Sequence, residues 1–322
     1  MSCRLAAAVV AIALALPAVA GAQQRFALVV SGATGGEEYA AQYAGWTDGF
    51  ARTLSGRLKF DPARVTVLSE SERPEAAATA ENVRKAIASV RQQMSPQDLL
   101  FVFLVGHGTF DGVDAKFNLV GRDLDAAGWA SLLQPLPGRV VIVNSTAGSF
   151  PFVQGLSGPR RIVITATDSV AQRFDTVFAE YFSKAFETDS ADLDKNQRIS
   201  IWEAFASAAA GVRRHYQQRG QLSTERALID DNGDGVGTSA AEQGQDGAQA
   251  SQTYLDQALP GAAPTDQELL KLLQRRSLLE AELAELKIRK AFLNTDEYTR
   301  EFERIITEFA RVSSEIRQRT KS

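Results

Sequence analysis

The chain has 322 residues, which is enough for one large domain with appendages or for two domains of ordinary size. Hydrophobic residues make up 44% and charged residues 23%, so the composition is that of a globular protein and excludes a disordered or fibrous chain. The net charge of −4 gives no basic surface for nucleic acid, and a single cysteine with only two histidines excludes disulfides and zinc sites rich in thiolate or imidazole.

The first 22 residues have the features of a secretory signal peptide. Arg4 precedes an apolar run from Leu5 to Leu16, Pro17 ends that run, and small residues stand before Gln23. We expect cleavage before Gln23, which removes Cys3, and export to the periplasm or the medium. An uncleaved membrane anchor is the alternative, although the apolar run is short for a bilayer span. We expect no membrane span after cleavage.

Strands and helices then alternate along the chain. Short apolar runs predict strands over 26–30, 65–68, 99–105, 140–143 and 162–165, and amphipathic stretches predict helices over 38–54, 80–93 and 174–186. Strands that are apolar on both faces and alternate with helices are typical of a parallel sheet covered on two sides. The sequence therefore predicts a doubly wound, mostly parallel α/β domain.

Two of these strands end in polar, turn-prone residues. Gly106-His107-Gly108 follows the strand over 99–105, and Asn144-Ser145-Thr146 follows the strand over 140–143. Because ligands of open parallel sheets bind outside the carboxyl ends of the strands, a hydroxyl one strand away could reach the imidazole. A capping histidine beside an ordinary turn is the alternative interpretation.

The two strand ends, taken with the next strand, resemble the caspase–legumain clan of cysteine peptidases, and the legumain-like branch most closely. The resemblance covers residues 25–186. It implies a caspase-like fold in which His107, followed by Gly108, occupies the place of the catalytic base. The turn that begins at Asn144 would then occupy the place of the nucleophile motif.

The nucleophile position departs from that family. Ser145 stands where the resemblance places a cysteine, with Thr146 as the alternative, and the acidic residue expected before it is absent. A serine hydroxyl carries no appreciable negative charge at neutral pH, and a Ser–His pair needs a third orienting group that the sequence does not identify. We therefore interpret the domain as an inactive peptidase homologue that binds a peptide or protein. An active hydrolase using Ser145 or Thr146 with His107 is the alternative.

Two acidic segments beyond residue 190 match the calcium loop of EF-hands. In the first, the side chains of Asp192, Asp194, Asn196, Ser200 and Glu203 and the carbonyl of Arg198 fall at the ligand positions, while Gln197 replaces the usual glycine. The second begins with Asp230, Asn232 and Asp234, but it has Ala241 at the last ligand position and Glu242 one residue late. The pattern predicts calcium at the first loop and leaves the second open. A solvated acidic loop is the alternative at both.

The amino-acid composition changes towards the end of the chain. Residues 243–264 have the composition of a linker, and residues 265–322 contain neither proline nor glycine and repeat apolar residues at helical spacing. We predict an α-helical coiled-coil hairpin with more apolar surface than two helices can cover, and favour self-association over packing on the chain's own domain. The predicted organisation is a signal peptide (1–22), a caspase-like domain (23–190), a calcium-binding region (191–242), a linker (243–264) and the hairpin (265–322).

Overall fold

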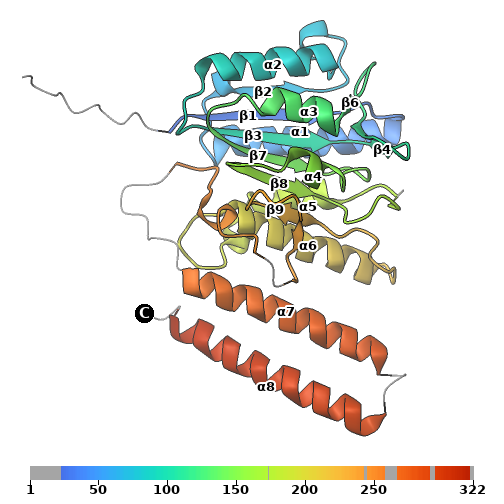
Figure 1. Ribbon diagram of the computed structural model, residues 1–322, viewed down its shortest axis with the longest axis vertical. Coiled ribbons are helices and arrows are strands. Elements are labelled where there is room, and N and C mark those ends of the chain that lie inside the picture. The colour runs from blue at the N-terminus through green and yellow to red at the C-terminus, as the bar shows by residue number, and fades with distance from the viewer. Residues whose placement is uncertain (1–22, 173, 243–244, 258–266, 291–293, 320–322) are drawn as a thin grey trace, which may run out of the picture.

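The computed structural model of the protein describes residues 23–172, 174–242, 245–257, 267–290 and 294–319. The signal peptide predicted over 1–22 lies outside these residues. Figure 1 shows an α/β domain with a two-helix appendage below it.

A seven-stranded mixed sheet forms the centre of the domain, in the order β10-β9-β8-β7-β3-β1-β2. Neighbours from β2 to β8 are parallel, and β9 and β10 are added antiparallel at one edge. The strands are β1 (Arg25–Ser31), β2 (Val65–Leu68), β3 (Leu99–Val105), β7 (Arg139–Asn144), β8 (Arg161–Thr165), β9 (Leu228–Asp230) and β10 (Thr238–Ser239). The apolar runs of the sequence become the buried middle strands, which confirms the predicted mostly parallel sheet.

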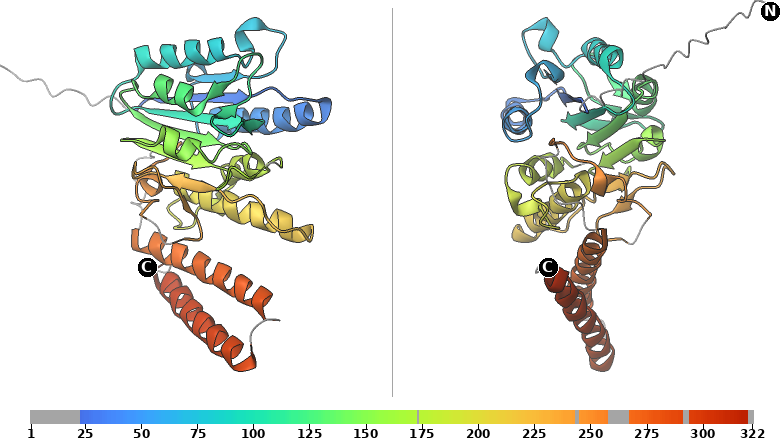
Figure 2. Two further views of the ribbon diagram at one scale, coloured as in Figure 1. Left: turned by 45° about the vertical axis from the view of Figure 1, so that its right-hand side comes forward. Right: turned by 90° about the vertical axis from the view of Figure 1, so that its left-hand side faces the viewer.

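Helices cover both faces of the sheet, as Figure 2 shows. One face packs against α1 (Glu37–Gly56), α5 (Phe178–Ala185) and α6 (Ile201–Gln218). The other packs against α2 (Ala80–Gln93), α3 (Ala126–Leu133) and α4 (Phe152–Leu156). Alternate residues of β3 enter the two cores, because successive side chains of a strand point to opposite faces. The fold is thus a doubly wound α/β sandwich.

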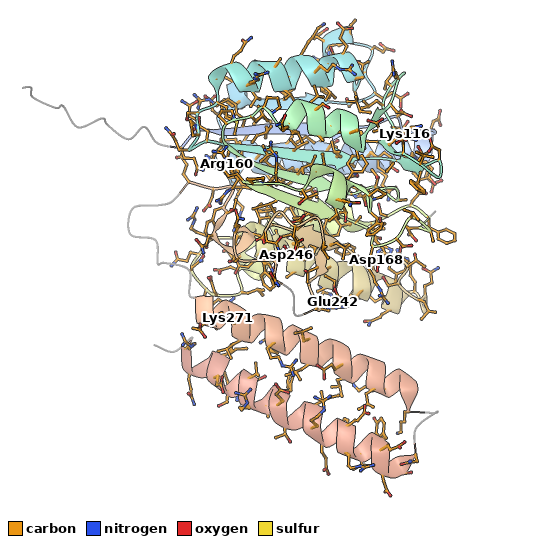
Figure 3. All side chains as sticks on the ribbon, viewed as in Figure 1. Lys116, Arg160, Asp168, Glu242, Asp246 and Lys271 are labelled. Atoms are coloured by element: carbon orange, nitrogen blue, oxygen red, sulfur yellow. The ribbon has the colours of Figure 1, made fainter. Side chains whose placement is uncertain are left out.

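A small antiparallel sheet of β4 (Gly108–Phe110), β5 (Ala115–Phe117) and β6 (Leu124–Asp125) sits between β3 and α3. Its strands are too short for a periodicity signal, so the sequence does not predict them. The sheet covers one side of the carboxyl edge, and Lys116 of β5 marks its place in Figure 3.

The helix predicted over 174–186 begins later, at Phe178. The carboxylate of Glu225 accepts hydrogen bonds from the backbone N–H groups of Val177 and Phe178, so the helix starts where those two donors find a partner. Residues 174–177 therefore stay in the loop that reaches the carboxyl edge of the sheet.

The predicted boundary between the domain and the calcium-binding region does not correspond to a structural division. Helix α6, which follows the first acidic loop, buries Trp202 and Phe205 in the same core as α1 and α5. Strand β9, which leads into the second loop, pairs with β8. The region over 191–242 is part of one domain because its apolar residues complete one face of the sheet.

The linker predicted over 243–264 also differs from the structure where it is described. Residues 245–257 pack on the domain, with Ala250 and Leu255 fully buried in its core. Asp231 holds this segment by accepting hydrogen bonds from the N–H groups of Gly247 and Ala250. The polar and small residues of this segment resemble those of a linker, but Ala250 and Leu255 anchor it to the core.

The appendage consists of α7 (Gln267–Arg289) and α8 (Thr295–Arg319), which pack against each other. Apolar residues of both helices are buried along the seam: Leu269, Leu279, Leu286, Ile305, Val312 and Ile316. Arg275 of α7 forms an ion pair with Glu308 of α8 at 2.8 Å. The predicted helical pair is present, and Leu193 of the first acidic loop packs against it.

Candidate functional site

The carboxyl ends of β1, β3 and β7 meet at one edge of the sheet because the three strands are parallel and adjacent. Backbone segments from different loops approach one another closely at this edge. A side-chain carbon added to Gly32 would lie 2.2 Å from the carbonyl oxygen of Asn118, and one added to Gly108 would lie 2.2 Å from Oγ1 of Thr146. Glycine at both positions lets the loops that follow the strands come together around His107.

His107 is held between two acceptors from different loops. Its Nε2 lies 3.0 Å from the carbonyl oxygen of Thr34, and its Nδ1 lies 3.1 Å from Oδ1 of Asp175. Both ring nitrogens of His107 therefore face oxygen atoms of the protein, from Thr34 and Asp175, rather than a candidate nucleophile.

Two tyrosines of α1 complete the surroundings of the imidazole. The hydroxyl of Tyr39 donates to Oδ2 of Asp175 at 2.5 Å, and its ring meets His107 edge to face. The hydroxyl of Tyr43 lies 3.4 Å from both ring nitrogens of His107. Burial is the main cause that raises the pKa of Tyr43, and the nearby carboxylate of Asp175 adds to it. Both phenols therefore remain neutral hydrogen-bonding groups at physiological pH.

The two candidate nucleophiles face other partners. Ser145 is buried and its hydroxyl donates to the carbonyl oxygen of Leu104 at 2.6 Å. Thr146 is also buried, and its hydroxyl donates to Oδ1 of Asn144 at 2.9 Å. Among the hydrogen bonds between described residues, none joins either hydroxyl to His107. The structure thus brings the predicted residues to one edge of the sheet without forming a nucleophile–base pair.

Exposed apolar side chains lie on loops that follow the strands ending at this edge. The β4–β5 turn carries Val113, the loop after β7 carries Phe150, and the loop after β8 carries Val170 and Phe174. Phe174 is 69% exposed, although it precedes Asp175, which contacts the imidazole. Solvent-exposed apolar residues that gather around a polar centre are typical of a surface that binds another molecule.

The first acidic loop gathers three buried carboxylates in front of α6. One oxygen each from Asp192, Asp194 and Glu203 lies within 4.8 Å of the others, so the three side chains could hold a metal ion. The N–H groups of Asn196 and Gln197 donate to Asp192 and wrap the loop around this centre. Gln197 adopts a positive φ of 66°, the conformation for which the position usually has glycine.

Burial makes the ionised form of these carboxylates unfavourable. Desolvation is the main cause that raises the pKa of Asp194 to about 7, and repulsion from Glu203 is the next. Burial raises the pKa of Glu203 in the same way. A bound cation would supply the positive charge that three clustered carboxylates need to stay ionised in this place.

The remaining predicted ligands surround the same loop. Ser200 caps α6 in a capping box with Glu203, whose Oε2 accepts from the N–H and the hydroxyl of Ser200. Asn196 donates through its amide to Asp194 and to the hydroxyl of Tyr254. The side chain of Arg198 turns away and forms an ion pair with Asp256 at 2.7 Å.

The second acidic loop folds like the first. Oδ2 of Asp230 accepts from the N–H of Gly235, five residues later, as Oδ2 of Asp192 accepts from Gln197. Asn232 and Asp234 exchange hydrogen bonds across the turn. Within the part of the chain that the structure describes, only the first loop brings oxygen atoms of three acidic side chains within 4.8 Å of one another. The acidic side chains of the second loop are therefore less closely gathered.

Asp246 takes the place in the second loop that Glu203 has in the first. Its Oδ1 accepts from the N–H groups of Asp231 and Asn232, and its Oδ2 accepts from the hydroxyl of Thr238. Glu203 likewise accepts from two successive N–H groups at the start of its loop and from the hydroxyl of Ser200. Figure 3 shows Asp246 on the side of the domain that faces Lys271 of α7.

Four residues of these sites carry no signal in the sequence that identifies them: Asp175, Tyr39, Tyr43 and Asp246. Asp246 follows Asp230 outside the twelve-residue window, so the loop pattern could not find it. Asp175 reaches His107 from a loop two strands away in the sheet, which residue spacing does not reveal. Tyr39 and Tyr43 are four residues apart on α1, a helical spacing that indicates one face but no partner.

Comparisons with known proteins assign no family. No family model matches the chain, and no curated protein matches it. Among solved structures, protein GSU0716 from Geobacter sulfurreducens is similar at a TM-score of 0.42 and 14% identity, over 65% of this chain and 93% of that one. No helix within the described segments combines the length and apolar character that crossing a membrane requires.

Proposed function

We propose that this protein is an exported, caspase–legumain-like peptidase homologue that binds an extended peptide or protein segment at the His107 edge without cleaving it. The hydrogen bond from Ser145 to Leu104 carries the proposal, because it turns the hydroxyl at the nucleophile position into the protein interior. A nucleophile must reach both its base and its substrate, and a buried hydroxyl bonded to a backbone carbonyl reaches neither.

The surroundings of His107 support binding. The imidazole with Asp175 offers polar groups in the middle of the edge, and Phe150, Val170 and Phe174 offer apolar contacts around them. An extended segment presents alternating side chains and backbone polar groups, which suit such a mixed surface. The alternative, an active hydrolase, would require Ser145 or Thr146 to give up its present hydrogen bond and turn toward His107.

A peptide array separates the two functions. Residues 23–322 are tested for capture of immobilised peptides, and the captured peptides are then examined by mass spectrometry for cleavage. We expect capture of intact peptides by the wild type, weaker capture by Phe174→Ser, and unchanged capture by Ile306→Ser, which removes an exposed apolar residue of α8. Cleavage that disappears in His107→Ala would establish the hydrolase instead, and absence of capture would contradict binding at this edge.

We further propose that the ion held by the first acidic loop is calcium. All ligand atoms offered there are oxygens, from Asp192, Asp194, Asn196, Ser200 and Glu203 with the carbonyl of Arg198. Hard oxygen donors in a twelve-residue loop that ends on a carboxylate favour calcium over softer metals. The second loop, with Asp230, Asn232, Asp234 and Asp246, is proposed as a weaker site of the same kind.

A further inference from the structure

A polar pocket of about 390 Å³ opens at the amino-terminal edge of the sheet, opposite to the His107 edge. Arg25 at the start of β1 and Arg139 at the start of β7 line it, together with Arg198 from the first acidic loop. Asp256 is the single acidic residue of the lining. The three guanidinium groups and one carboxylate leave this pocket with a net positive charge.

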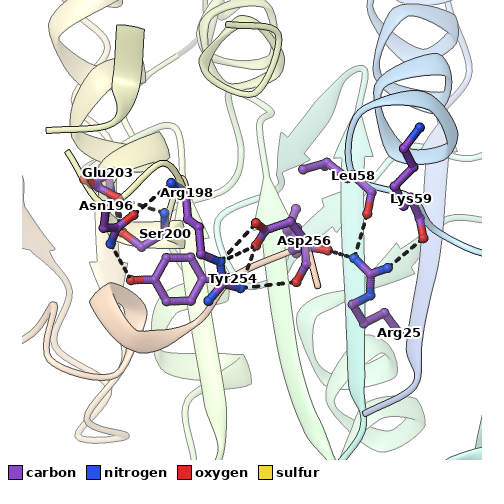
Figure 4. Close-up of polar contacts among 10 residues, drawn as sticks. Arg25, Leu58, Lys59, Asn196, Arg198, Ser200, Glu203, Tyr254 and Asp256 are labelled. Atoms are coloured by element: carbon purple, nitrogen blue, oxygen red, sulfur yellow. Dashed lines mark hydrogen bonds and ion pairs between the residues drawn. The ribbon is translucent and has the colours of Figure 1, made fainter. Parts of the chain in front are cut away.

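Two of the arginines donate hydrogen bonds to neutral acceptors. Arg25 is 5% exposed, and its guanidinium donates to the carbonyl oxygens of Leu58 at 2.8 Å and Lys59 at 2.7 Å, as Figure 4 shows, and to that of Leu255. Arg139 donates to the hydroxyl of Thr253. Among the ion pairs between described residues, none joins Arg25 or Arg139 to a carboxylate. Neutral acceptors orient these cations, while the negative charges of Asp256 near Arg25 and of Asp231 near Arg139 act on them without forming an ion pair.

The third arginine is already neutralised. Both Nε and Nη2 of Arg198 donate to the carboxylate of Asp256, and its guanidinium stacks on the ring of Tyr254. Figure 4 shows Asp256 between Arg198 and Arg25. Asp256 is therefore paired with Arg198, and Arg25 and Arg139 are the two cations of the lining that form no ion pair with a described residue.

We propose that this pocket binds an anion through a carboxylate or phosphate group, with Arg139 as its main ligand. A guanidinium has five N–H donors, and Arg139 uses one of them, toward Thr253, among the described residues. Its remaining donors have the planar geometry that pairs with two oxygens of a carboxylate or phosphate. Arg25 contributes charge from deeper in the wall, and the pocket is of the size that small-molecule sites usually have.

The lining explains why the ligand should be small and polar. Apart from the ring of Tyr254, the wall consists of charged and polar side chains, among them Gln252, Thr253 and Gln257. Such a wall offers many hydrogen-bonding groups, and its apolar surface comes from the ring of Tyr254 and from the carbon stems of the polar side chains. The pocket is separate from the peptide-binding edge, and this inference does not depend on the proposed function.

Calorimetric titration at constant ionic strength tests the inference on residues 23–322, with inorganic phosphate and succinate as the two probes. We expect saturable binding of at least one probe and about a tenfold loss of affinity in Arg139→Gln, because a charge-assisted pair is removed. Arg91→Gln removes the same charge from an exposed position on α2 and should bind like the wild type. Binding of phosphate alone or of succinate alone assigns the group that the pocket selects.

Gln257→Glu provides a second variant that leaves the arginines of the pocket in place. It adds a carboxylate of nearly the same shape at the exposed rim of the pocket, where it should repel the probes and supply an internal counter-ion. We expect weaker binding of both probes with an unchanged fold. Absence of binding by either probe in the wild type, or binding that neither Arg139→Gln nor Gln257→Glu weakens, would overturn the proposal.

Discussion

The hydroxyl of Ser145 donates to the carbonyl oxygen of Leu104 across the boundary between β7 and β3. This contact extends the pairing of the two strands, since the N–H of Ser145 also donates to the same carbonyl oxygen. A residue that resembles a nucleophile in sequence thus continues, just beyond the end of β7, the hydrogen bonding between β7 and β3. The direction of the Ser145 side chain, toward Leu104, keeps its hydroxyl away from His107.

This geometry predicts that a thiol at the same position stays unreactive. Ser145→Cys should show no cleavage of Asn-, Asp- or Arg-containing peptides, and iodoacetamide should label it at least about tenfold more slowly than a surface thiol. Ser89→Cys on the exposed side of α2 provides that reference. Peptide cleavage by Ser145→Cys that is lost with His107→Ala would show that the two residues can form a working pair.

Calcium should stabilise the protein through the first acidic loop. At ten times its dissociation constant, which we expect near 10⁻⁴–10⁻³ M, calcium should raise the free energy of unfolding by about 1.4 kcal/mol. Thermal melts with calcium and with chelator should then differ by a few degrees. Glu203→Gln should remove the difference, while Glu187→Gln, an exposed change of the same kind, should keep it. Identical wild-type melts in millimolar calcium and chelator would favour the solvated-loop interpretation.

Asp246 should determine the number of calcium ions bound. Calorimetric titration is expected to find a weaker second site in the wild type and to lose it in Asp246→Asn. Glu242→Gln is the matched control, because Glu242 is exposed and accepts only from the N–H of Ser239 among the described hydrogen bonds. Loss of the second site in Glu242→Gln, with retention in Asp246→Asn, would show that the residue nearer to the twelve-residue pattern is the ligand.

Glu225 should make the stability depend on pH. Burial raises the pKa of Glu225 from 4.5 to about 7. The folded protein therefore holds this proton more tightly than the unfolded chain, and the free energy of unfolding falls as the pH rises through this window. The loss should be on the order of 3 kcal/mol, since each pKa unit corresponds to about 1.4 kcal/mol.

Denaturant unfolding at several pH values measures this effect. Between pH 4.5 and 7 the wild type should lose stability relative to Glu225→Gln, which imitates the protonated acid at all pH values. The stability of Glu187→Gln, a change at an exposed glutamate, should depend on pH in the same way as that of the wild type. Parallel pH profiles of the wild type and Glu225→Gln would mean that the carboxyl group is ionised in the folded protein throughout.

The helical pair should pack on its own domain. Its buried seam is formed by α7 and α8 of one chain, and Leu193 of the first acidic loop lies against it. We expect residues 23–322 to be monomeric at tens of micromolar by light scattering. Removal of residues 264–322 should lower the melting temperature without changing the association state. A dimer that becomes monomeric on truncation would support the self-association favoured by the sequence.

The sequence by itself determined the alternating order of strands and helices. The run over 99–105 is apolar at every position and can only be buried on both faces, which requires helices on two sides of a sheet. It also determined the first acidic loop, because the ligand positions of such a loop are local and fall within twelve residues. The same strong local signals placed His107 and Ser145 at neighbouring strand ends.

Only the tertiary structure decided what those residues contact. The direction of the Ser145 hydroxyl depends on the carbonyl of Leu104 in a neighbouring strand, and the partner of His107 comes from the loop that carries Asp175. Asp246 and the arginine pocket likewise depend on segments far apart in sequence that folding brings together. Such contacts are set by how the packed elements align, and residue spacing along the chain carries no record of that alignment.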